Sequence, residues 1–306
     1  MADYTDSTGE AASVTSVTAL LCWESRGELI AGIGSSLHIF TLPASTTQSF
    51  TSKDDEAPVD RPQRIQVFPR GHKIHGITCR PSENVLAVFG DRILAVADQV
   101  LTHGAPGTAS RHASWQATSF RMAVLDRWIW DVLPFQRGRL AVSLARSQVR
   151  ILTDGLKEVL RYQCTDTELT WSSKLIARSD PSWEHVVELL VAGGTSRGKL
   201  LVWRVNELSP TSSIVLDRPS SIVVSPEFEA ESHQGSIFAV DSSPDGTVLV
   251  TAGDDRSFRV WRAIRSNPLV FQSTACIYSH TGRVWKTLLI TPRSSSASQH
   301  IVVVTA

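Results

Sequence analysis

Residues 235–263 read GSIFAVDSSPDGTVLVTAGDDRSFRVWRA, and this stretch carries the pattern that decides the fold. Three apolar runs are separated by two turns, PDG (244–246) and GDD (253–255). Apolar residues that alternate with polar ones, or run on for a few positions between Gly, Pro and Asp clusters, predict β-strands. The stretch therefore predicts a set of three short strands.

The same design returns along most of the chain. Strand sets recur roughly every 40 to 60 residues, which fits the ~40–45-residue period of β-propeller blades with additional loops. We therefore predict an all-β propeller that is incomplete, with about five and a half blades of an expected seven. The predicted blades cover residues 14–43, 64–98, 121–160, 164–206 and 232–264, and a half-blade covers 276–306.

Segments rich in Ser, Thr and Pro lie between the strand sets, after a polar N-terminus (1–13) that we expect to be disordered. This composition predicts surface loops rather than domain linkers. One of these loops contains apolar runs at 212–224 that also fit an outer strand. The predicted loops are 43–64, 98–119, 207–232 and 291–299.

Four side chains around the opening stretch occupy characteristic places. His233 precedes the first strand, Thr251 lies on the second, Asp255 lies in the second turn and Trp261 closes the third strand. The arrangement resembles the WD40 repeat, in which such a quartet forms a buried hydrogen-bonded chain, the WD tetrad. The resemblance implies a WD40-type β-propeller in which Asp255 accepts turn amides and the His N–H, while the Trp indole donates to the hydroxyl. Asp255 is therefore expected to lock the blade rather than to catalyse a reaction.

The segment GGTSRGK (193–199) fits the GxxxxGK spacing of a phosphate-binding loop. Such a loop also needs a Ser or Thr next and a helix whose amides point at the phosphate. Leu200 and the strand-like LLVWRV (200–205) follow instead. We interpret the segment as a hairpin turn.

His72, His75 and Cys79 have the side chains of metal ligands. On a strand, residues separated by an odd number face opposite sides, so the two histidines are not expected to converge. His72 and His280 instead occupy the blade-start position of their units, and Trp203 the third-strand position. We predict no catalytic residue, no cofactor and no metal, and therefore no enzyme.

The totals favour a neutral protein without targeting signals. The 306 residues include 30 basic and 30 acidic side chains, whereas a protein that holds nucleic acid alone usually has a basic face. The four cysteines form no CxxC pair, which is typical of reduced, buried thiols in a cytosolic protein. The N-terminus is no secretory or transit signal, and no apolar run is long enough for a bilayer. We expect a cytoplasmic protein that does not insert into membranes.

Aromatic and arginine side chains near the predicted turns form a candidate surface for a partner or for tRNA. Such residues dominate many protein-binding hot spots, although core packing is the usual role of tryptophan. The candidates are Trp128, Trp130, Asp131, Arg256, Arg283 and Trp285.

Seven stretches, taken in order, resemble one family: the WD-repeat protein that partners an FtsJ-like tRNA ribose 2′-O-methyltransferase. The likeness covers about residues 17–306, and that family is much longer, with more than one propeller, of which this chain resembles the first. The stretches are RGHKIHGI (70–77), LAVFG (86–90), DRWIWDV (126–132), CTDTELTWSSKLI (164–176), VAGGTSRGKLLVW (191–203), TAGDDRSFRVW (251–261) and SHTGRVWKTLL (279–289).

The resemblance implies accessory work in tRNA methylation. The partner would hold S-adenosylmethionine and transfer the methyl group, while this protein would share the tRNA and help to bring its anticodon wobble ribose to that site. Members of the family are also linked to endosomal recycling. A generic interaction scaffold in trafficking or ubiquitin pathways is therefore the alternative.

The last residues, IVVVTA (301–306), fall inside the predicted sixth blade. A propeller closes by pairing its last blade with its N-terminal strand, which removes free sheet edges. We therefore expect a fragment or a truncated gene model with an open edge and marginal stability alone.

Overall fold

The structure is a computed structural model of the 306-residue chain. Every regular element among the described residues is a strand, which confirms the all-β class. The chain divides into two compact units, residues 1–124 and 125–306. The structure describes residues 16–23, 28–41, 62–80, 85–98, 120–134, 138–153, 155–165, 170–179, 186–205, 220–266, 269–278, 280–290 and 302–305.

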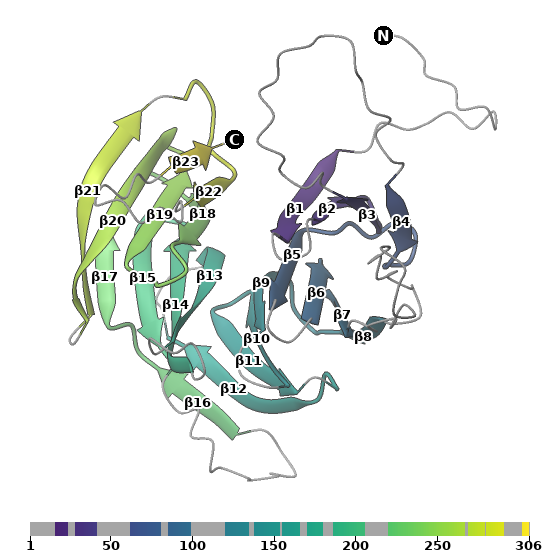
Figure 1. The fold of residues 1–306 in the computed structure, drawn as a ribbon. Coiled ribbons are helices and arrows are strands. Elements are labelled where there is room, and N and C mark those ends of the chain that lie inside the picture. Colours follow the sequence, from purple (N-terminus) through teal and green to yellow (C-terminus); the bar gives the residue numbers. More distant parts are fainter. Residues whose placement is uncertain are drawn as a thin grey trace, which may run out of the picture. The chain divides into compact units, whose positions relative to one another are not determined.

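The first unit contains two antiparallel sheets of four strands each, paired in chain order (Figure 1). Tight turns with a positive φ at Gly34 and Asp91 join the second and third strands of each sheet. The first sheet consists of β1 (Val17–Trp23), β2 (Glu28–Ile33), β3 (Ser36–Thr41) and β4 (Gln63–Gln66). The second consists of β5 (Gly76–Arg80), β6 (Val85–Gly90), β7 (Ile93–Asp98) and β8 (Phe120–Val124).

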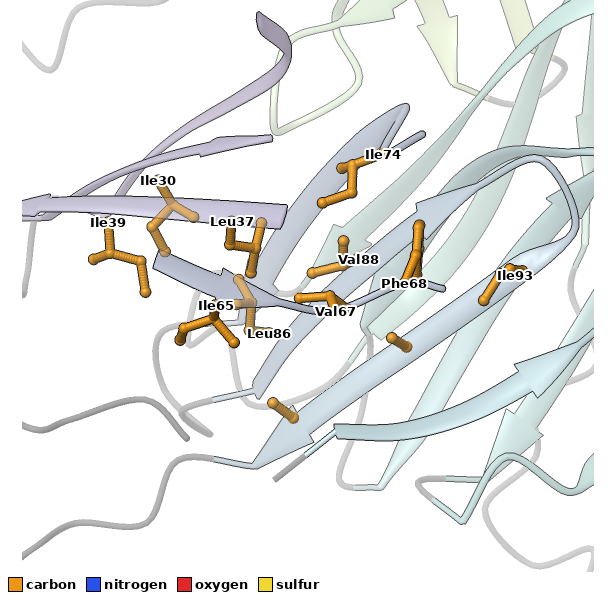
Figure 2. Close-up of a cluster of buried hydrophobic side chains, with 12 residues drawn as sticks. Ile30, Leu37, Ile39, Ile65, Val67, Phe68, Ile74, Leu86, Val88 and Ile93 are labelled. Atoms are coloured by element: carbon orange, nitrogen blue, oxygen red, sulfur yellow. The ribbon is translucent and has the colours of Figure 1, made fainter. Parts of the chain in front are cut away.

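One apolar cluster joins these two sheets. Figure 2 shows Ile30 and Leu37 from the first sheet with Leu86 and Val88 from the second, and all four are fully buried. Ile74, on the connection before β5, is buried with them. A Cβ at Gly32 would lie 2.7 Å from the Ile74 side chain, so the close contact between the sheets requires glycine at this position.

The second unit contains four sheets, built mainly from antiparallel hairpins (Figure 1). The third sheet contains β9 (Ile129–Pro134), β10 (Arg139–Leu144), β11 (Gln148–Thr153) and β12 (Glu158–Cys164). The fourth contains β13 (Thr170–Ser179), β14 (Val186–Thr195), β15 (Lys199–Arg204) and β17 (Phe228–Glu231). The fifth contains β18 (Ile237–Ser242), β19 (Val248–Gly253), β20 (Ser257–Ser266) and β21 (Leu269–Tyr278), and a sixth pairs β22 (Thr287–Ile290) with β23 (Val302–Thr305).

The outer strands differ from the expected blade limits. Residues 64 and 121, expected to open the second and third blades, lie on β4 and β8, which pair with the preceding hairpins. The predicted 207–232 loop likewise contains two strands. The pairing partner of an isolated strand is a long-range property that local sequence does not show. The blade limits as a whole remain a prediction.

Strand β16 (Ser220–Val224) lies within the apolar segment 212–224 and adds a fifth strand to the third sheet. It pairs in parallel with β12, from Leu160–Ser220 to Cys164–Val224. Residues 212–219 lie outside the described residues, as do residues 1–13 and most of the other predicted loops.

The expectation of buried thiols is wrong for two of the four cysteines. Cys22 and Cys276 are exposed, whereas Cys79 is half-buried and Cys164 is buried. Alternation along the strands decides this, because neighbouring residues face opposite sides of a sheet. Within the part of the chain that the structure describes, no helix has the length and apolar character needed to cross a bilayer.

Candidate functional site

The four tetrad side chains lie together in the fifth sheet. The Trp261 indole N–H donates to Thr251 Oγ1 over 3.1 Å, and Thr251 Oγ1 lies 2.8 Å from His233 Nε2. His233 Nδ1 lies 3.0 Å from Asp255 Oδ1. Thr251 has no exposed surface, and His233 and Trp261 are also buried.

Donor and acceptor rules fix the direction of this chain. An indole only donates and a carboxylate only accepts, so the Thr251 hydroxyl accepts from Trp261 and donates to His233 Nε2. His233 is thereby held neutral, with its proton on Nδ1 and directed at Asp255. Asp255 also accepts the backbone N–H groups of Gln234 and Ser257, both over 3.1 Å. Each member of the network has a partner, as a buried polar network needs in order to stabilise the sheet.

The electrostatics agree with this arrangement. Burial alone would raise the pKa of Asp255, but hydrogen bonds from His233, the Ser257 hydroxyl and two amides outweigh it and lower the pKa to about 2. Burial lowers the pKa of His233 below 6.5, and the Asp255 carboxylate opposes this only in part. A carboxylate held in this way serves to fix the turn, because its acceptor sites are occupied by the protein itself.

Asp131 is not part of an exposed surface, contrary to the prediction. Its side chain is largely buried, and Asp131 Oδ2 accepts the backbone N–H of Leu175 on β13 over 2.8 Å. The carboxylate therefore joins the first strand of the third sheet to the first strand of the fourth. Asp241 repeats the device between the fifth and sixth sheets, where its Oδ2 accepts the backbone N–H of Leu289 over 2.8 Å.

Lys174 lies between these two carboxylates. Its Nζ is 3.9 Å from Asp131 Oδ2 and 3.3 Å from Asp241 Oδ1. Asp131 raises the pKa of Lys174 despite burial, and Asp241 adds to this effect. Burial raises the pKa of Asp131, which Lys174 and two amides offset only in part. Sequence reasoning missed Lys174, because the charges it meets are supplied by other sheets.

The three predicted surface tryptophans take part in two aromatic pairs. Trp128 and Trp130 lie with ring centroids 6.1 Å apart at the beginning of β9, and Trp128 is 39% exposed. Trp285 is 56% exposed and stacks on Phe238 with centroids 4.4 Å apart and planes 19° apart. Trp128 and Trp285 are thus accessible, in contrast to Trp203, whereas Trp130 is half-buried and its indole Nε1 is enclosed.

The two predicted arginines differ in their surroundings. Arg283 Nε lies 2.6 Å from Asp254 Oδ1, so this exposed cation already has a carboxylate partner. Arg256 is exposed at the turn between β19 and β20, with a φ of 64°. Sequence reasoning missed Trp171, which is 42% exposed. Trp171 is the second residue of the first strand of its sheet, as Trp130 is. This shared position is the sequence signal that could have identified it.

The GGTSRGK segment is a hairpin turn, as predicted. Thr195 ends β14, Lys199 begins β15, and the two strands pair antiparallel. The Thr195 hydroxyl accepts the backbone N–H of Lys199 over 3.0 Å, and Lys199 Nζ lies 2.6 Å from Glu229 Oε1. The lysine side chain and its backbone N–H therefore form hydrogen bonds within the sheet.

His72 and His75 converge, although opposite faces were expected. His72 Nδ1 and His75 Nε2 lie 3.3 and 3.2 Å from the carboxylate of Asp91. Residues 72–75 precede β5, so strand alternation does not apply to them. On β5, burial raises the pKa of the Cys79 thiol to about 11, which disfavours the thiolate that a metal would need.

Comparison with known families and structures accounts for the repeated sheets. The family model described as "WD domain, G-beta repeat" matches residues 225–262, which include all four tetrad side chains. The chain carries a WD40 repeat. The β-propeller domain of Cps50 (Swd1) from Myceliophteria thermophila is similar with a TM-score of 0.57 and 12% identity. That match covers 87% of this chain and 73% of the other, and it confirms the predicted WD40-type β-propeller class.

The predicted family resemblance is also confirmed. The mouse (Mus musculus) protein named tRNA (34-2'-O)-methyltransferase regulator WDR6 is 27% identical over 296 residues. The proteins of the same name from Bos taurus and Homo sapiens are 27% and 26% identical, over 300 and 296 residues. Each match covers 94% of this WD40 chain but 23% of the relative, so the chain spans about a quarter of the length of these relatives.

Replacing Thr251 by Val should destabilise the fifth sheet by about 2 kcal/mol or more. The substitution keeps the shape of the side chain but leaves a buried indole N–H and a buried imidazole nitrogen without partners. Urea unfolding followed by tryptophan fluorescence measures the effect. Thr274→Val, at an exposed threonine of β21, is the matched control and should change little. Equal effects of the two substitutions would contradict the role of the tetrad.

The stability of the fifth sheet should fall as the pH is lowered. His233 has a pKa below 6.5 when folded, so below about pH 6.5 the unfolded chain binds the additional proton. The contribution of Asp255 is complete above about pH 4 and is lost toward its folded pKa of about 2. Melting temperatures from about pH 7.5 to 5.5 should fall less steeply in His233→Gln than in the wild type. Parallel slopes would show that His233 is not the titrating group.

Replacing Asp131 by Ala should cost about 3 kcal/mol, because it leaves Leu175 N–H without an acceptor and removes a carboxylate from Lys174. Asp131→Asn keeps an acceptor oxygen and should cost less. Hydrogen exchange at the Leu175 amide should accelerate more in the Ala variant than in the Asn variant. Unchanged exchange in both would rule out the link between the third and fourth sheets.

Proposed function

We propose that this chain is a non-catalytic WD40 adaptor that supports 2′-O-methylation of the tRNA wobble ribose. The methyl transfer is performed by a methyltransferase partner of the FtsJ-like class. The adaptor shares the tRNA with that partner and acts in the cytoplasm.

The observation that carries this proposal is the match to relatives named tRNA (34-2'-O)-methyltransferase regulators over 94% of the chain. Position 34 is the wobble position of the anticodon, and the name describes regulation of an enzyme rather than catalysis. The structure also supports a non-catalytic role for this chain. The acid of the opening stretch, Asp255, holds a turn, and the lysine of the phosphate-loop-like segment is paired with Glu229.

The exposed aromatic residues support a binding role. Trp128, Trp171 and Trp285 present large apolar surfaces at the beginnings of three sheets. Tryptophan and arginine are the residues most enriched in binding hot spots. An adaptor needs such surfaces, whereas stability of the sheets does not require them to be exposed.

Deleting the gene should abolish wobble-ribose 2′-O-methylation in bulk tRNA while the methyltransferase remains at its normal level. Mass spectrometry of nucleosides from digested tRNA measures the mark, and immunoblotting of the methyltransferase is the control. Expression of the wild-type protein should restore the mark. An unchanged mark in the deletion strain would overturn the proposal and favour the scaffold of trafficking or ubiquitin pathways.

A further inference from the structure

The first strands of three consecutive sheets share an aromatic residue at the same place. In β9, β13 and β18 the second residue is Trp130, Trp171 and Phe238, respectively. Each has no partner across the strand pair, because the register shifts by one residue there: Ile129 and Asp131 pair with Leu144 and Ser143, for example. A β-bulge of this kind re-aims the side chain of the additional residue. Trp285, stacked on Phe238, continues the series toward the sixth sheet.

The turns at the same end of these sheets each carry an exposed arginine. Arg146 lies between β10 and β11, Arg197 between β14 and β15, and Arg256 between β19 and β20. Arg146 and Arg256 have φ values of 65° and 64°, a conformation that glycine and asparagine adopt at lower cost.

Hydrogen bonds join the turns that carry the arginines to the segments that carry the aromatic residues. Ala145 N–H, beside Arg146, donates to Trp128 O over 2.8 Å, and Ser147 on the other side contacts Thr170, the neighbour of Trp171. The turn of Arg197 is joined to the beginning of β18, where the Ser236 hydroxyl donates to Ser196 O over 3.0 Å.

The third turn is connected in the same way. Asp254 N–H donates to Ser236 O over 2.9 Å, and Val284 N–H, beside Trp285, donates to Gly253 O over 3.1 Å. Aromatic and arginine side chains therefore alternate along one end of the second unit. We call this row the aromatic–arginine strip; it consists of Trp130, Arg146, Trp171, Arg197, Trp285 and Arg256.

Among the described residues, the acids near the strip are already paired within the protein. Five aspartates in this region of the second unit already contact a cation or a histidine of the protein. These pairs are Asp126–Arg150, Asp131–Lys174, Asp241–Lys174, Asp254–Arg283 and Asp255–His233. The three strip arginines, by contrast, form no ion pair with any residue described in the structure. The described part of the strip therefore carries three guanidinium groups without an acidic partner, although the chain is neutral overall.

We propose that the aromatic–arginine strip binds unpaired RNA bases, such as those of a tRNA loop. The inference rests on the proposed function and assigns residues to the shared tRNA. Bases stack on aromatic rings and on guanidinium planes, and arginines between the rings bind the phosphates that connect the bases. Alternation of the two residue types matches the alternation of base and phosphate along a single strand. A protein surface would supply carboxylates to these arginines at particular places only, so the regular row favours the nucleic acid.

Binding of an RNA hairpin with an unpaired loop tests the inference. Fluorescence anisotropy is recorded with the full 306-residue protein, and a fully paired RNA of equal length is the reference. Trp171→Ala and Trp285→Ala should each weaken hairpin binding about tenfold. Arg146→Gly with Arg256→Gly should also weaken it and should reduce the salt dependence, log Kd against log salt, by about 1.4. Glycine suits the positive φ, so these variants should remain folded.

Arg262→Ala with Arg265→Ala removes two exposed charges from β20 outside the strip and is the matched control. Hairpin binding that is undetectable, that equals binding of the paired RNA, or that the control weakens as much as the strip variants do would overturn the inference. Loss of methyltransferase co-purification in the strip variants, with hairpin binding intact, would assign the strip to a protein partner instead. The adaptor function would survive these results, because the wobble-ribose mark in deletion cells tests it separately.

Discussion

The carboxylate of Asp255 organises the fifth sheet of the protein. It accepts the His233 N–H and two backbone N–H groups, so the segment before β18 and the turn after β19 are held against each other. Through His233 and Thr251 the same chain of hydrogen bonds reaches Trp261 in the core. Because all four side chains are buried or partly buried, each hydrogen bond must be satisfied from within the sheet, which leaves the carboxylate no capacity for chemistry.

A second set of carboxylates acts between sheets rather than within them. Asp131 and Asp241 each accept a backbone N–H from the first strand of the next sheet, and Lys174 lies between them. Such links set the spacing of consecutive first strands, and with it the spacing of the residues at their beginnings. The charged groups that hold this part of the unit together are therefore paired with each other.

These two sets of hydrogen bonds and ion pairs determine which side chains remain accessible at the end of the second unit that carries the aromatic–arginine strip. Among the described residues, the acids at this end are paired, and a bulge lies beside the exposed ring of Trp171 on its first strand. The accessible side chains described at this end include aromatic rings and guanidinium groups, a combination suited to binding. The match to relatives named as methyltransferase regulators and the accessible aromatic and arginine side chains at this end of the sheets both support the proposed adaptor role.

The sequence alone determined the strand sets, the turns between them, the WD tetrad and the family resemblance. Hairpins depend on turn residues and on apolar periodicity within a few positions, and both are local properties. The tertiary structure decided the rest: that β4 and β16 pair as they do, that Asp131 is buried against the next sheet, and that Trp171, Arg146 and Arg197 join the predicted tryptophans. These outcomes depend on contacts between residues of different sheets, whose separation along the chain conceals their proximity in space.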